Sequence, residues 1–202
     1  MPSRASRFWK VIGVAGALAG LVAWPGTGQA QSSTSTLTGQ ASVATAVVLG
    51  TVTSLVDTGT LTDPSEPLGT GLPIGGIPGL LTAESLHAVT MGWTDQVASE
   101  ASLSNLAMSV AGTGVSADFI QSRALAVSGA VPTGLTSIEG LTIGGVPVSP
   151  AGIPNETISL GGLSVILNEQ IQSASGIVVN ALHVRTLDGS TDVVVGSAKA
   201  GI

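Results

Sequence analysis

The chain has two histidines, and each lies in an apolar stretch that alternates as a β-strand does. His87 lies in the sequence Leu-His-Ala-Val, and His183 in Leu-His-Val. Imidazole is a common metal ligand, but a structural zinc site takes four ligands. Neither histidine has an acidic residue two positions away, where both side chains would share a strand face. The sequence therefore predicts hydrogen-bonded strand histidines and no metal site.

Two other polar patterns have structural interpretations. Residues 188–192, Asp-Gly-Ser-Thr-Asp, lack the third oxygen ligand and the closing Glu of an EF-hand, so we expect a hairpin turn in which Asp192 begins the next strand. Asn155-Glu156-Thr157 matches a glycosylation sequon, which matters only in a host that glycosylates exported proteins. Asn168 and Asn180 lie in apolar strand sequence and are expected to satisfy backbone groups at strand ends or bulges.

One acidic residue stands in a pattern that resembles the catalytic turn of aspartic peptidases. Residues 55–59 read Leu-Val-Asp-Thr-Gly. In such enzymes two carboxyl groups share one proton, so that one of them activates water. The chain has one Asp-Thr-Gly, so a peptidase would need a homodimer that brings Asp57 to its copy. The surrounding sequence instead favours a strand that ends in an Asx turn at Asp57.

No other catalytic pattern is present in the sequence. There is no cysteine to act as a nucleophile, and no Gly-x-Ser-x-Gly pattern that would place a serine on a strained turn. We therefore assign no catalytic, cofactor-binding or metal-binding residue, and we expect no cofactor and no enzymatic activity. The alternative is a secreted hydrolase, a dimeric aspartic-type peptidase that uses Asp57.

Residues 1–30 have the pattern of a secretory signal peptide. Three basic residues precede the apolar run Val11–Trp24, and Gly28 and Ala30 are small residues of the kind that signal peptidase requires. The run is shorter than the roughly 20 residues that cross a bilayer as a helix. We expect Sec-type export with cleavage near Ala30, and no membrane span in the mature chain. Its location would be extracellular or at the cell surface, or periplasmic in a Gram-negative host that retains it.

The remaining chain is long enough for one domain. It carries all twelve acidic residues of the sequence and three basic ones, Arg123, Arg185 and Lys199, hence a net charge of −9 with neutral histidines. This charge disfavours nucleic acid and anionic membranes as partners. Trp93 and Phe119 are its two aromatic residues, so the core must be aliphatic. A carbohydrate-binding module is a third option, which this composition disfavours because sugar platforms usually use exposed aromatics and only Trp93 is available. Trp93 is the residue to test for that function.

Alternating apolar residues and glycine turns predict an all-β domain over residues 41–202, after a flexible lead-in at 31–40. A strand pair broken at Gly50 is expected over 41–56, a loop over 58–78, and a strand over 80–91 with Glu84 on its solvent face. Strands at 97–110 and 115–127 flank a glycine turn, and shorter strands follow at 135–143 and 156–160. The end of the chain predicts an antiparallel meander over 163–200, with a two-residue hairpin at Asp188-Gly189.

We expect an antiparallel β-sandwich, with a β-solenoid as the alternative because weak internal similarities also occur. The runs 177–179 and 193–195 are continuously apolar, which is typical of neighbouring central strands covered on both faces. If one face stayed open, the same strands would form an adhesive surface.

Several motifs in order resemble the bacterial family called choice-of-anchor P. They are Leu141-Thr-Ile-Gly-Gly145, Pro154-Asn-Glu-Thr-Ile-Ser-Leu160, Val165-Ile-Leu-Asn-Glu-Gln170, Val179-Asn-Ala-Leu-His-Val184 and Asp192-Val-Val-Val-Gly-Ser-Ala198. The resemblance is close over about the last sixty residues and looser from Ala41 through Val115-Ser-Ala-Asp118. Family members often have two cysteines where this chain has Ala124 and Ala200, so a disulfide is not expected.

The resemblance implies an exported bacterial protein that is displayed at the cell surface or released from it. Members carry differing C-terminal sorting signals, and no catalytic residues are established for them. No sorting motif follows Ala198, so we expect a released or non-covalently retained protein. The expected function is that of a structural or interaction protein. Its expected partners are other extracellular or surface proteins, or further copies of itself bound through sheet surfaces and edges.

Overall fold

The computed structural model describes residues 36–64 and 67–202, which form thirteen β-strands and no helix. The strands are β1 (Thr38–Val48), β2 (Thr51–Asp57), β3 (Leu68–Ile77), β4 (Leu81–Gly92), β5 (Gln96–Val110), β6 (Thr113–Val127), β7 (Thr133–Glu139), β8 (Thr142–Ile143), β9 (Val146–Pro147), β10 (Glu156–Leu160), β11 (Leu163–Gln172), β12 (Gly176–Thr186) and β13 (Thr191–Gly201). The predicted leader and residues 31–35 of the predicted lead-in lie outside the described residues. In the described part of the chain, no helix suited to crossing a membrane is found.

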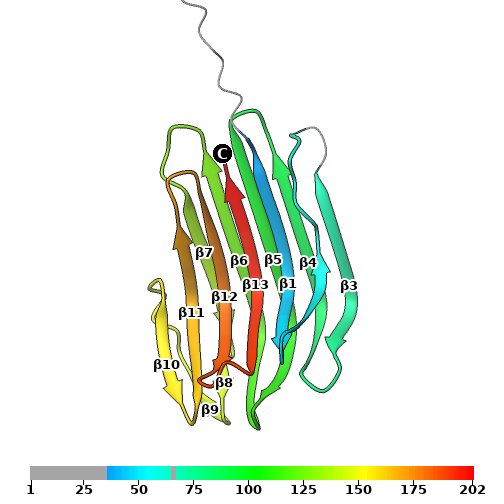
Figure 1. The fold of residues 1–202 in the computed structure, drawn as a ribbon, viewed down its shortest axis with the longest axis vertical. Helices are drawn as coiled ribbons and strands as arrows, with labels where there is room; N and C mark the ends of the chain where they lie inside the picture. Colours follow the sequence, from blue (N-terminus) through cyan, green and yellow to red (C-terminus); the bar gives the residue numbers. More distant parts are fainter. Residues whose placement is uncertain (1–35, 65–66) are drawn as a thin grey trace, which may run out of the picture. The chain divides into compact units, whose positions relative to one another are not determined.

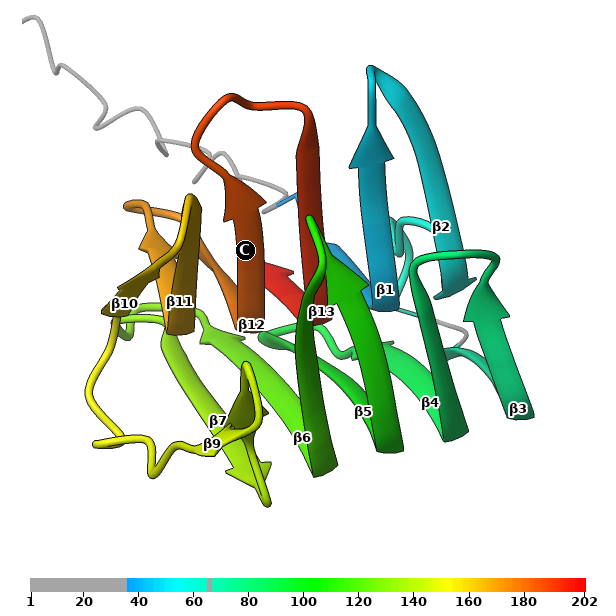
Figure 2. The same cartoon turned by 90° about the horizontal axis from the view of Figure 1, so that it is seen from below.

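The strands form two antiparallel sheets (Figure 1). Sheet A has the order β10-β11-β12-β13-β1-β2. Sheet B has the order β3-β4-β5-β6-β8-β9, and β7 also pairs with β6. Figure 2 shows the two sheets as layers that face each other. This confirms the predicted sandwich. The solenoid alternative is wrong, because every strand pair is antiparallel.

The C-terminal meander is confirmed as β11, β12 and β13, but its last turn is longer than predicted. The loop between β12 and β13 comprises four residues, 187–190, rather than the dipeptide Asp188-Gly189. The Gly189 N–H donates to the carbonyl of Thr186 at 3.1 Å, and Gly189 has a φ of 73°. The glycine takes the left-handed conformation after a β-turn, which lets a longer loop close.

Three predicted boundaries need correction. The first strand begins at Thr38, inside the expected lead-in, because buried Leu37 and a Gly39–Leu61 bridge hold this segment. The expected loop over 58–78 contains the ten-residue strand β3, which tolerates Pro73 because an edge strand needs hydrogen bonds on one side only. The expected strand over 135–143 is two strands, β7 and β8, separated at Gly140, which has a φ of 63°.

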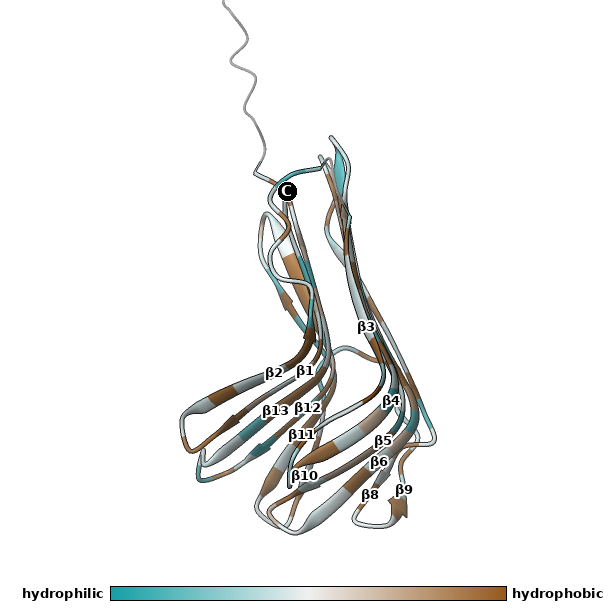
Figure 3. Ribbon diagram, turned by 90° about the vertical axis from the view of Figure 1, so that its right-hand side faces the viewer, coloured by the Kyte–Doolittle hydropathy of each residue, from teal (hydrophilic) through white to brown (hydrophobic). Residues whose placement is uncertain are grey.

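Both sheets bend in the same direction near their middle, and the outer face of sheet A lies on the inside of the bend (Figure 3). In sheet A the bend follows one row of residues across five strands: Val56, Val43, Gly196, Ala181 and Asn168. Three of these, on alternate strands, have positive φ: Val56 at 53°, Gly196 at 65° and Asn168 at 51°. The left-handed residues interrupt the regular pleat along this row.

The bend also switches which residues face the core. In sheet A, pairs of consecutive residues such as Val43-Ala44 and Ala181-Leu182 are all buried. In sheet B, consecutive residues such as Glu84-Ser85 are both exposed, and Ser85 has a φ of 50°. In each sheet the doubled residues lie on the convex side of the bend, where the extra residue lengthens that side.

This switch corrects the predicted faces of β4. Strict alternation placed Ser85 on one face with Leu81 and Ala83, and Leu86 on the solvent face with Glu84. In the structure Glu84 is exposed as expected, but Leu86 is buried and Ser85 is exposed. The left-handed Ser85 adds a residue between the two halves of the strand, so the inward positions change parity there.

The core consists of two apolar clusters between the sheets. The larger one includes bulky side chains such as Leu103, Leu167 and Leu182. The smaller one is built mostly from alanine and valine, and its residues in β13, Ala198 and Ala200, follow the bend at Gly196. Buried hydroxyls lie beside the smaller cluster: Ser99 Oγ lies 2.7 Å from Thr90 Oγ1 and donates to the Lys199 carbonyl of the facing sheet at 2.6 Å. The sheets are therefore linked by both apolar contact and hydrogen bonds.

Candidate functional site

Polar side chains gather on the outer face of sheet A, along the inside of the bend. The sequence predicted that β12 and β13 are central, and they are. It was wrong about both faces being covered, because no described element packs on the outer face, where Val178 and Val194 are only half-buried. The parity switch at the bend determines which residues this face presents, among them Asn180 and His183 of β12.

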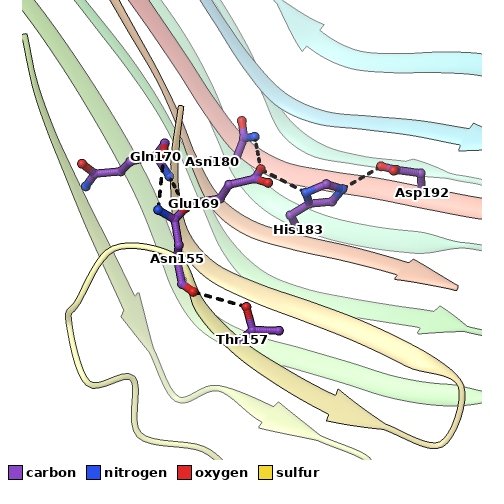
Figure 4. Close-up of polar contacts among 7 residues, drawn as sticks. All are labelled: Asn155, Thr157, Glu169, Gln170, Asn180, His183 and Asp192. Atoms are coloured by element: carbon purple, nitrogen blue, oxygen red, sulfur yellow. Dashed lines mark hydrogen bonds and ion pairs between the residues drawn. The ribbon is translucent and has the colours of Figure 1, made fainter. Parts of the chain in front are cut away.

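Four of these side chains form one hydrogen-bonded chain across three strands (Figure 4). Asn180 Nδ2 donates to Glu169 Oε2 at 2.6 Å. The same carboxylate oxygen lies 3.0 Å from His183 Nδ1, and His183 Nε2 lies 3.0 Å from Asp192 Oδ1. The exposed fractions of the His183 and Glu169 side chains are 12% and 15%, against 44% for Asp192. The hydrogen-bonded group is therefore mostly buried at its β11 end and more exposed to solvent at its β13 end.

The three residues Glu169, His183 and Asp192 connect neighbouring strands through their side chains, and we call this group the Glu169–His183–Asp192 brace. Each ring nitrogen of His183 has a carboxylate oxygen within hydrogen-bonding distance, so the imidazole links strand β11 to strand β13 across β12. Both ring nitrogens are engaged by these two carboxylates. The predicted hydrogen-bonded strand histidine is confirmed at this position.

A cleft of about 320 Å³ lies beside this chain, on the same face. We call it the bend cleft. Its floor includes Val178 and Val194, and its polar residues are Gln40, Ser42, Thr45, Asp57, Asn180, Ser197 and Lys199. Asn180 is 6% exposed, and its Oδ1 has no hydrogen-bond partner in the structure. Asn180 thus bonds to Glu169 of the brace and lines the cleft.

Asp57 forms the strand-terminating turn that the sequence predicts. Its Oδ1 accepts from the Gly59 backbone N–H at 2.7 Å, and its two carboxylate oxygens lie 3.1 and 3.2 Å from Gln40 Nε2. Thr58 completes the turn by accepting from the Ala41 N–H through its hydroxyl at 3.0 Å. The Asp-Thr-Gly pattern therefore has a structural function at the end of β2.

The two histidines are not brought together. His87 is exposed on β4 in sheet B, whereas His183 is on β12 in sheet A. Among residues 36–64 and 67–202, no group of three or more His, Asp or Glu side chains is arranged to hold a metal ion.

Asp188 and Asp192, the two acidic residues of the 188–192 segment, have different structural roles. The Thr186 hydroxyl, followed by the Ser190 backbone N–H, lowers the pKa of Asp188 from 3.8 to about 2. The Ser190 N–H donates to Asp188 Oδ1 at 3.0 Å, as in an Asx turn. Asp192 instead lies on β13 beside His183, so the predicted division into a turn and a strand start is confirmed.

The asparagines differ from the prediction in their partners. Asn168 does lie at a left-handed position in the bend, but its Oδ1 accepts from the Gln170 side chain at 2.9 Å rather than from a backbone group. Asn180 bonds a carboxylate, as described above. Asn155 of the sequon is exposed and accepts from the Gln170 backbone N–H at 2.9 Å, next to the start of β10. Trp93 lies between β4 and β5, away from the bend cleft.

Sequence reasoning missed the link between His183 and its two carboxylates. Glu169 and Asp192 are 14 and 9 residues away from it, on the strands that flank β12. A search for acidic residues on the same strand cannot find such a group. The available signal was the predicted meander itself, because neighbouring antiparallel strands place side chains of the same face beside each other.

Comparison with known proteins identifies no relative. No model of a protein family matches the chain, and no curated protein and no solved structure matches it. The resemblance to choice-of-anchor P therefore stays a prediction based on the sequence motifs.

Proposed function

We propose that this protein is an exported, non-catalytic interaction protein that associates with further copies of itself through the β2 edge of sheet A. Export rests on the leader pattern of residues 1–30, and the choice-of-anchor P resemblance supports a place at the bacterial cell surface or outside the cell. The observation that carries self-association is the composition of β2.

The edges of the two sheets differ in how well they resist pairing with another strand. On sheet B, β3 contains Pro73, β7 pairs only with β6 and ends in the charged Glu139, and β9 has only two residues, one of them Pro147. On the other edge of sheet A, β10 has five residues and begins with the charged Glu156. Proline, charge and short length are the features that prevent edge-to-edge association.

The β2 edge has none of this protection over most of its length. Its first six residues, Thr-Val-Thr-Ser-Leu-Val, contain no charge, proline or glycine, and Asp57 comes only at its end. Val52 is 64% exposed, and the adjoining turn exposes Leu49. Figure 2 shows β2 at one end of its layer, where a second copy can add its own β2 in antiparallel orientation.

This proposal predicts that one lysine on β2 separates the copies. Val52→Lys would place two like charges close together in a symmetric strand pair, and we expect it to weaken association by at least roughly tenfold. Size-exclusion chromatography with light scattering, across a range of protein concentrations, measures the change. Circular dichroism checks that the variant keeps its strand content.

The matched control is Val131→Lys, which makes the same change at a 75%-exposed valine in the loop before β7. It is expected to leave association unchanged. A wild-type protein that stays monomeric at high concentration would contradict self-association, as would equal effects of the two variants.

The competing hypothesis is the dimeric peptidase that uses Asp57. Purified wild-type protein is incubated with a mixture of acidic peptides beside Asp57→Ala. We expect no cleavage from either. Cleavage by the wild type that Asp57→Ala abolishes would overturn the non-catalytic proposal.

A further inference from the structure

The bend cleft has the size and position of a small-ligand site. It lies on the inside of the bend in sheet A, and its residues come from four different strands, β1, β2, β12 and β13. Its volume of about 320 Å³ is near the lower end of the range for ligand sites, roughly 300–1,000 Å³. Because it lies on the face of the sheet, self-association along the β2 edge leaves it open.

We propose that the bend cleft binds a neutral, hydroxylated ligand, specifically a small saccharide. The lining offers both donors and acceptors: the Gln40 amide, the Asp57 carboxylate and the hydroxyls of Thr45 and Ser197. Sugar hydroxyls both donate and accept, so they match such a mixed set. Val178 and Val194 supply an apolar floor for the C–H face of a sugar ring, in place of the aromatic side chain that the cleft lacks.

The charges in the cleft favour a neutral ligand. Asp57 and Lys199 both line it, and their formal charges cancel. A formally charged ligand would be attracted by one of them and repelled by the other. A saccharide can instead accept from the ammonium group and donate to the carboxylate, and bonds to charged groups are stronger than those between neutral groups.

Asn180 supplies the observation that points to a missing partner. Its side chain is almost fully buried, and Oδ1 has no donor. The bond from Nδ2 to Glu169 fixes the amide, and Figure 4 shows the oxygen pointing away from that carboxylate. A buried acceptor without a partner is unfavourable. A ligand therefore gains affinity if one of its hydroxyls moves aside the atoms that cover Asn180 Oδ1 and donates a hydrogen bond to this oxygen.

The rest of the lining is held in place before a ligand arrives. Asp57 holds Gln40 through two contacts, and Ser42 Oγ lies 3.3 Å from Thr45 Oγ1. The Glu169–His183–Asp192 brace holds Asn180. Side chains that are already ordered lose little conformational entropy on binding. The brace is therefore a positioning device for the cleft.

The test is a titration of isotope-labelled protein with the neutral disaccharides cellobiose and N,N′-diacetylchitobiose, followed by NMR. At least one of them is expected to shift the backbone amides of Gln40, Asn180 and Ser197. Ser197→Val places a residue that strands accept well on β13, but it removes a hydroxyl and fills the cleft, so it should weaken binding at least roughly tenfold. Thr45→Val, which changes shape least, provides a second variant with an expected weakening in the same direction.

Ser159→Val is the matched control, because Ser159 is exposed on β10, outside the cleft. It should bind as the wild type does. The proposal is overturned if saturating disaccharide leaves the cleft amides unchanged, or if Ser197→Val and Ser159→Val bind equally well. Binding of gluconate or glucosamine in preference to the neutral sugars would also overturn it, because the charge argument would then be wrong.

Discussion

His183 is surrounded by carboxylates on two neighbouring strands, and this determines what it does. Each ring nitrogen lies 3.0 Å from a carboxylate oxygen, and the side chain is 12% exposed. The imidazole gives Glu169, which is itself mostly buried, a hydrogen-bond partner. The residue therefore links three strands of sheet A.

Removing this imidazole should destabilise the protein. In His183→Ala, the mostly buried Glu169 carboxylate loses this hydrogen-bond partner, and we expect a loss of about 2 kcal/mol in the free energy of unfolding. His183→Gln keeps one amide donor and should lose less. Urea denaturation followed by circular dichroism measures both values.

The other histidine is a natural control for this experiment. His87 is exposed on sheet B, so His87→Ala is expected to change the free energy of unfolding by less than about 0.5 kcal/mol. Equal losses for His87→Ala and His183→Ala would show that the brace does not stabilise the fold.

At the scale of the strands, the bend depends on residues that accept a left-handed backbone. Gly196 on β13 has a φ of 65°, and a Cβ added there would lie 3.2 Å from both the Ala181 and Ile120 side chains. It is therefore subject to two constraints, a conformational one and a steric one. Its neighbours in sequence, Val195 and Ser197, face opposite sides of sheet A, which places Ser197 in the bend cleft.

We expect Gly196→Ala to destabilise the protein by more than about 1 kcal/mol, because alanine is unfavourable at positive φ and also crowds the core. The comparison is Gly112→Ala in the turn between β5 and β6. Gly112 has a φ of 78°, but nothing lies within 4 Å of an added Cβ. Both losses in the free energy of unfolding are measured in urea. The difference between them gives the contribution of steric crowding to the loss in Gly196→Ala. A Gly112→Ala loss as large as that of Gly196→Ala would contradict close packing at the bend.

At the scale of the described domain, the sandwich has unequal halves. The large cluster buries leucines such as Leu103 and Leu167, whereas the small cluster consists mainly of alanine and valine, with Leu37 and Ile177 as its largest buried side chains. Ser122, buried beside the bend, has a hydroxyl without a partner. Less apolar area is removed from water on that side, so local opening should cost less free energy there.

Native-state hydrogen exchange tests this difference. Amides of Val165 and Val184, beside the large cluster, are expected to exchange at least roughly tenfold more slowly than those of Val179 and Ala198, beside the small one. All four residues lie on strands of sheet A that have neighbours on both sides, so edge effects do not enter. Uniform exchange across the four amides would indicate that the sandwich opens as one unit.

The sequence by itself determined the all-β class, most strand positions and the C-terminal meander. These features depend on local chemistry. Apolar residues that alternate within 97–110 and 115–127 need no information from elsewhere, and glycines at 112 and 189 mark turns because they accept positive φ. The Asp57 turn was predictable for the same reason, since its hydrogen bond to the Gly59 N–H spans two residues.

Only the tertiary structure decided where the candidate site lies. Strand β3 forms despite its glycines and Pro73 because β4 offers an edge to pair with. Asn168 and Ala181 interrupt the alternation, and the residues after them therefore face the other side. The pairing of β11, β12 and β13 then brings Glu169, His183 and Asp192 together. Register and bend depend on contacts between distant segments, which local sequence patterns do not contain.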